Sequence, residues 1–295
     1  GPRRGSARHR SGRLRAAPAR KSSMPGLDAS LIAACALLGM IAGFLGGLLG
    51  IGGGVVIVPA LLLLFEQHGL GGALATPMAV ATSLATIVFT SLAAARAQLS
   101  RGAVTWTLVR RWTPGLLLGG VLAGPLAARL PPVALQGFLG LFLGAAALVL
   151  FTRWQPAPHR THPGPRGSLA LSSIAGLASG LAGIGGGNVI VPTLAFLNVP
   201  MQRATATSST LGVPISVAGT VGFVLAGLEV PGLPAGTLGF VYLPAAAAIA
   251  ASAFLCAPAG VALGHRIPAL ILRRVFGGLL VLVASRLLFG AFADG

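Results

Sequence analysis

Long apolar runs with almost no charged residues follow one another along this chain of 295 residues. Only 8% of the residues are charged, whereas a soluble domain carries about a quarter. Uncharged apolar runs of about 18 residues or more are typical of membrane-spanning helices, and these runs lack the alternation of a membrane barrel. The runs lie at Leu27–Leu49, Thr76–Ala95, Pro114–Ala128, Val133–Phe151, Ala204–Gly227, Gly236–Gly264 and Val275–Phe289. The sequence therefore predicts an all-α polytopic membrane protein embedded in a lipid bilayer.

The same glycine-rich run occurs twice. GLLGIGGGVVIVP extends from Gly47 to Pro59, and GLAGIGGGNVIVP extends from Gly180 to Pro192. Three further features repeat in the same order: an Ala-Thr-Ser segment, an apolar run that ends near a Gly/Pro pair, and a closing apolar run. Four matches in one order predict an internal duplication.

A polar, proline-rich stretch divides the two copies. We predict a first transmembrane repeat at 27–151, a linker at 152–168 and a second repeat at 169–291, with about eight transmembrane helices in all. Each repeat opens with a glycine-interrupted helix, because glycine inside a helix costs roughly 1 kcal/mol relative to alanine. Residues 1–26 form a basic leader that we expect to be disordered. Met24 is a candidate natural start, and the leading Gly-Pro is a candidate cleavage scar.

The net charge of +17 would suit a nucleic-acid partner, but its placement argues against one. Eight of the 21 basic residues precede Met24, and most of the others lie at helix ends, where they orient a membrane protein. Eight straight crossings with a cytoplasmic N-terminus would put the stretches 96–111 and 152–168 on the cytoplasmic side. They would put the loop with Arg273 and Arg274 outside, against the positive-inside rule. A re-entrant segment after each glycine run would invert one half relative to the other, and both arrangements stay open at this point.

The glycine runs suit an anion site near the middle of the bilayer. Unwound glycines expose backbone N–H groups, and the half-helix that follows adds the positive end of its dipole. The candidate residues are Gly52, Gly53 and Gly54, with Gly185, Gly186 and Gly187 in the second copy. Asn188 replaces Val55 in the duplicate and offers an amide donor. The simpler interpretation is close helix packing through small residues.

The Ala-Thr-Ser segments add candidate hydroxyl ligands in step with the glycine runs. They are Thr82 and Ser83 in the first copy, and Thr207, Ser208 and Ser209 in the second. The competing interpretation is that these hydroxyls bond back onto carbonyls of their own helices.

No catalytic, metal or cofactor site is expected. The five histidines lie in the leader or in loops, the four acidic residues lie near helix ends, and Cys35 and Cys256 lack metal-ligand spacing. An intramembrane enzyme is therefore disfavoured, whereas an anion channel of the same fold stays an alternative to a carrier. Arg286, inside the last apolar run, is either a functional charge or a side chain that reaches the nearer membrane surface.

Paired GxxGIGGGxxxVP runs with Ala-Thr-Ser segments resemble the sulfite exporter TauE/SafE family, and the resemblance covers about Leu27 to Phe289. It implies a permease of the bacterial inner membrane that moves sulfite, sulfonates or related organosulfur anions, with the glycines as motif positions. We predict alternating access about the two glycine breaks. Proton coupling suits a bacterial exporter, although no residue demonstrates it. The sequence fixes neither the direction of transport nor the oligomeric state, and a homodimer stays an option.

Overall fold

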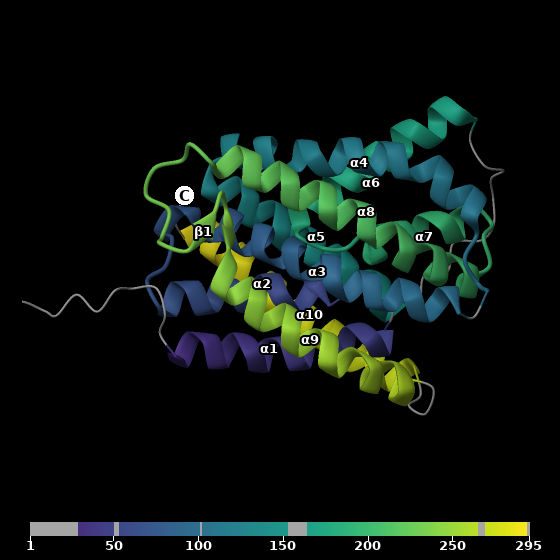
Figure 1. The fold of residues 1–295 in the computed structure, drawn as a ribbon, viewed down its shortest axis with the longest axis horizontal. Coiled ribbons are helices and arrows are strands. Elements are labelled where there is room, and N and C mark those ends of the chain that lie inside the picture. The colour runs from purple at the N-terminus through teal and green to yellow at the C-terminus, as the bar shows by residue number, and fades with distance from the viewer. Residues whose placement is uncertain (1–28, 50–52, 101, 153–163, 265–268, 294–295) are drawn as a thin grey trace, which may run out of the picture.

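The computed structural model describes residues 29–49, 53–100, 102–152, 164–264 and 269–293, and it is helical almost throughout (Figure 1). The first half holds α1 (Ala29–Leu49), α2 (Gly54–Gln67), a short 3-10 helix η1 (Gly72–Leu74), α3 (Ala75–Leu99), α4 (Trp106–Arg129) and α5 (Pro132–Thr152). The second half holds α6 (Pro165–Ala182), α7 (Gly187–Phe196), α8 (Met201–Gly227), the hairpin β1 (Thr237–Leu238) and β2 (Val241–Tyr242), α9 (Leu243–Gly264) and α10 (Ala269–Ala293). The basic leader lies outside the described residues, and α6 begins within the stretch predicted as a linker.

Five helices are long and apolar enough to cross a membrane by length and composition. Their apolar segments are Ala29–Gly46, Gly72–Leu99, Pro132–Val149, Arg203–Gly227 and Leu243–Gly260. Together they confirm an all-α, multi-pass membrane protein. The count of eight crossings and the internal duplication stay predictions.

The opening helix of each half packs against a helix of the other half. The helix α1 packs along α9, where Gly39 and Gly43 contact the backbone of Ile249 and Ala253. In the same way α6 packs along α4, where Gly119 contacts the backbone of Ser173. Small residues allow such close approach in a membrane, where van der Waals packing drives helix association. The opening helix of each half therefore packs on the fourth α-helix of the other half.

The contacts also fix the direction of each helix. Along α1 and α9, and along α4, α6 and α8, the contacting residue numbers rise together, so these helices are parallel within each set. Across α3 and α8, Leu84 meets Gly219 and Ser91 meets Gly212, so this central pair is antiparallel. The helix α9 runs back from the end where α8 stops (Figure 1). Hence α1 and α6 run in opposite directions, and α2 returns toward the end from which α1 started.

Most described arginines lie at one end of the molecule. That end is built from the end of α3 and the starts of α4, α6, α8 and α10, and we call it the arginine-rich end. It carries Arg96, Arg110, Arg111, Arg166, Arg203 and Arg274. The conflict expected for Arg274 from eight straight crossings is therefore removed, because the start of α10 lies at the same end as the starts of α4 and α6.

At the opposite end, Arg286 of α10 lies 3.5 Å from the Glu66 carboxylate of α2. The two side chains are 62% and 52% exposed, respectively, so neither is buried in the protein. This geometry agrees with Arg286 reaching the membrane surface and offers no buried charge for transport.

Candidate substrate site at the glycine breaks

Both glycine runs interrupt the helices in which they lie. Gly53 precedes α2 with φ of 66°, and Gly183 follows α6 with φ of 68°. Gly186 has φ of 79° and immediately precedes α7. These are left-handed conformations, which L-residues with a β-carbon rarely adopt. Residues 50–52, including the candidate Gly52, lie outside the described residues.

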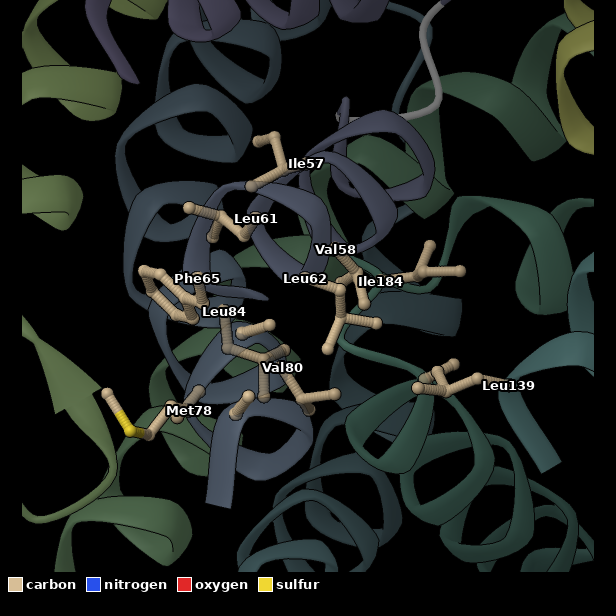
Figure 2. Close-up of a cluster of buried hydrophobic side chains, with 14 of the residues drawn as sticks. Ile57, Val58, Leu61, Leu62, Phe65, Met78, Val80, Leu84, Leu139 and Ile184 are labelled. Carbon is tan, nitrogen blue, oxygen red and sulfur yellow. The ribbon is translucent and has the colours of Figure 1, made fainter. Parts of the chain in front are cut away.

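The two breaks lie against each other in the buried centre. A methyl group added at Gly54 would lie 2.8 Å from the carbonyl oxygen of Gly183 and 3.2 Å from the Cα atom of Ile184. The hydroxyl of Ser83 donates to the Gly183 carbonyl at 2.9 Å, which ties the second break to α3. Figure 2 shows Ile184 next to the side chains of α2, including Val58 and Leu62, within the main hydrophobic core. Two segments from different halves thus form one compact site.

Ile87 of α3 lies between the breaks. Its Cδ1 atom would be 2.5 Å from a methyl group on Gly54, and its Cγ2 atom 2.6 Å from one on Gly185. On α8, Gly212 faces Gly185, since a methyl group there would lie 2.8 Å from the Gly185 carbonyl oxygen and from Ser91 Oγ. Sequence reasoning missed Ile87 because it looks like any apolar residue. Gly212, a glycine inside a long apolar run, carried a weak signal.

Each break presents the start of a half-helix. The amides of Val56 and Ile57 donate to the Gly53 carbonyl, and those of Val189 and Ile190 donate to the Gly186 carbonyl. The amides just ahead, at Gly54–Val55 and Gly187–Asn188, belong to the first turn, where no acceptor exists within the helix. Two dipole ends whose first-turn amides have no acceptor within their own helices can bind an anion.

The four predicted hydroxyls other than Ser83 divide into three groups. The Oγ1 atom of Thr82 accepts a hydrogen bond from the Tyr242 amide at 3.0 Å, and that of Thr207 accepts one from the Thr105 amide at 3.1 Å. Ser209 donates to a carbonyl of its own helix at 2.9 Å, as the competing interpretation expected. Ser208 is fully buried, and its Oγ has no partner among the residues that the structure describes. Of the five predicted hydroxyls, Ser83 is the one with an observed hydrogen bond to a residue of a glycine break.

Within the described residues, no cluster of three or more His, Cys, Asp or Glu side chains could hold a metal ion. The chemistry around the breaks comes from backbone amides, backbone carbonyls and hydroxyls in an apolar surrounding. Such a site can replace part of the water shell of a small anion without a permanent positive charge.

Comparison with known proteins agrees with this architecture. A family model described as sulfite exporter TauE/SafE matches residues 35–287. A probable membrane transporter protein of Haemophilus influenzae is 32% identical over 256 residues, which cover 86% of this chain and 97% of that protein. The probable membrane transporter protein YunE of Bacillus subtilis is 28% identical over 211 residues, or 65% of this chain and 77% of that protein. No solved structure matches the chain. The chain therefore belongs to the sulfite exporter TauE/SafE family of membrane transporters.

Proposed function

We propose that this protein is a secondary transporter, without enzymatic activity, that moves a small sulfur oxyanion or organosulfur anion across the bacterial inner membrane. The observation that carries the proposal is the contact between the two glycine breaks in the buried centre. Interrupted helices that meet at the midplane are the usual transport site of folds with inverted halves. The family description supports sulfite or a sulfonate as the substrate class.

The proposed site combines donors from both halves. The first amides of α2 and α7 would bind the oxyanion at Gly53–Gly54 and Gly186–Gly187, where the lack of side chains lets a ligand approach the backbone. Ser208 offers a buried hydroxyl as a further donor. Ser83, Thr82 and Thr207 would act by holding the backbone around the ligand, since each already bonds a main-chain group.

Alternating access would use two bundles that differ from the two halves of the sequence. The helix α9 packs with α1 and α3, whereas α4 packs with α6 and α8. The two bundles meet along α3 and α8, which is also where the breaks lie. Rocking about this seam would open the site toward one end of the molecule and then toward the other. Ile87 would have to withdraw from between the breaks when substrate binds.

The test is uptake of radiolabelled sulfite into proteoliposomes, with and without an imposed proton gradient. We expect saturable uptake that a small sulfonate inhibits more strongly than sulfate does, and counterflow against internal unlabelled sulfite. Gly53→Leu and Gly186→Leu should abolish uptake, because each position has a left-handed φ and close neighbours. Gly137→Leu, at a position with no atom within 4 Å, should transport normally.

Unchanged uptake in both break variants would overturn the site. Non-saturable flux with single-channel currents would favour an anion channel instead. Absence of flux for every sulfur anion in the properly inserted wild-type protein would overturn the substrate class.

A further inference from the structure

A groove of about 650 Å³ lies at the arginine-rich end, beside the first turns of α4. It is lined by Trp106, Thr107, Arg110 and Arg111. Trp106 is 52% exposed, and Arg110 is exposed as well. The proposed transport site uses none of these residues, so the groove needs its own explanation.

The start of α4 is firmly held, which gives the groove a fixed shape. The Thr105 amide donates to Thr207 Oγ1 of α8 at 3.1 Å. Leu108 and Trp112 are buried in the second hydrophobic cluster, together with residues of α6, α7 and α8. Because these two residues occupy the inward face of α4, the helical period turns Thr107 and Arg110 outward.

An exposed apolar stripe continues along α4 below Arg110. Pro114, Leu117 and Val121 follow Arg110 at helical spacings of four, seven and eleven, so they lie on one face. The exposed members of the stripe are Pro114, Leu117, Leu118, Val121, Leu122 and Leu126. From Pro114 to Leu126 the helix rises about 18 Å, close to one leaflet of a hydrocarbon core that is about 30 Å thick.

We propose that this groove binds the phosphate headgroup of an anionic phospholipid, whose acyl chains lie along the stripe. The guanidinium of Arg110 matches a phosphate with paired N–H donors, and the half-exposed Trp106 has the position of an interfacial aromatic anchor. The acidic side chains that the structure describes, Glu66 and Glu229, lie on α2 and after α8, at the opposite end. A soluble anion would use the arginines alone, whereas a phospholipid would contact the arginines with its headgroup and the adjoining apolar stripe with its acyl chains, so the combined surface fits a lipid.

The test is native mass spectrometry of the full chain, released from detergent micelles that contain equimolar phosphatidylglycerol and phosphatidylcholine. Wild type should retain phosphatidylglycerol in preference to phosphatidylcholine. Arg110→Gln should lower this preference roughly fivefold, the share of one surface arginine near an anionic headgroup. Arg129→Gln is the matched control, because Arg129 is exposed at the other end of the same helix, and it should behave as wild type.

Two further arms make the result decisive. Arg110→Lys, which keeps the charge but loses the paired donors, should fall between wild type and Arg110→Gln, and it decides the case if the glutamine variant does not fold. Equal lipid retention in wild type and the Arg110 variants, or an equal loss in Arg129→Gln, would overturn the proposal. Binding of inorganic sulfate that depends on Arg110, with no preference for phosphatidylglycerol, would also overturn it and assign the groove to soluble anions.

Discussion

Ile87 is the residue on which the two halves of the proposed site converge. Its Cδ1 atom faces Gly54 of the first break, and its Cγ2 atom faces Gly185 of the second. The two glycines differ in what else surrounds them. A methyl group on Gly54 would also meet the backbone of Gly183, whereas one on Gly185 would meet only side-chain atoms, those of Ile87 and Ser91, within 4 Å. A flexible side chain can move away from an added methyl group, whereas the packed backbone of Gly183 cannot do so easily.

This difference predicts which glycine substitution can be rescued by a second substitution at Ile87. Gly54→Ala and Gly185→Ala should each lower the rate of sulfite uptake by about tenfold or more. A tenfold loss corresponds to an activation free energy of transport that is higher by about 1.4 kcal/mol. Adding Ile87→Ala should restore a substantial part of uptake to Gly185→Ala but not to Gly54→Ala, because the clash with the Gly183 carbonyl remains. The measurement is initial uptake rate per inserted protein, with Ile87→Ala alone as the control. Equal rescue of both variants would contradict the assigned contacts.

Ser83 and Ser208 occupy equivalent places in the two Ala-Thr-Ser segments, yet only Ser83 has an observed partner. Ser83→Ala should lower the free energy of unfolding by about 1 kcal/mol, since a buried hydrogen bond is lost. Ser208→Ala should leave stability nearly unchanged but raise the sulfite concentration needed for half-maximal uptake. Thermal unfolding in detergent and uptake kinetics check the two effects separately. A stable Ser208→Ala protein with wild-type kinetics would remove this hydroxyl from the site.

Among the elements, the starts of α4 and α9 show how the halves are joined. Thr82 of the first half accepts a hydrogen bond from the amide of Tyr242, immediately before α9. Thr207 of the second half accepts one from the amide of Thr105, immediately before α4. Each threonine therefore anchors a helix of the opposite half. Their repetition in step with the glycine runs reflects this shared structural task as well as any role near the ligand.

Removing either acceptor should loosen the attachment of the helix that follows the donor. Thr82→Val and Thr207→Val should each destabilise the protein by about 1 kcal/mol, the net contribution of a lost hydrogen bond. Thr82→Ser and Thr207→Ser keep the oxygen and should recover most of the loss. Thermal unfolding of the detergent-solubilised proteins gives the comparison. Valine variants as stable as the serine variants would show that water or another group replaces the acceptor.

The sequence predicted the elements better than their arrangement. The helix interruptions at Gly53 and Gly186 were predictable because consecutive glycines act locally, through backbone conformation. The packing of α1 on α9 was not, because it depends on surfaces about 200 residues apart in the chain. The site shows the same limit. The glycines could be recognised because their run is repeated in the sequence. The contacts of Ile87 and the hydrogen bond between Ser83 and Gly183 form only when the two breaks pack together, so the sequence pattern does not reveal them.

At the scale of the whole molecule, the charges of the residues that the structure describes predict the orientation in the membrane. The arginine-rich end should face the cytoplasm, where basic residues are favoured, and Glu229 should face outward. In a background of Cys35→Ala and Cys256→Ala, a membrane-impermeant maleimide applied to intact spheroplasts should label Glu229→Cys and spare Ser100→Cys. Both positions are exposed, and labelling of both after lysis is the control. The reverse pattern would invert the orientation.

The packing of each opening helix on a helix of the other half has a consequence for how the protein is made. The helix α1 leaves the ribosome early, but its main partner α9 begins only at Leu243. At synthesis rates of about 5–20 residues per second, α1 waits roughly 10–40 s for that partner. During this time its glycine-lined face is open to lipid or to an insertion factor. The first half thus cannot complete its packing as it is synthesised, and assembly must finish after nearly the whole chain has entered the membrane.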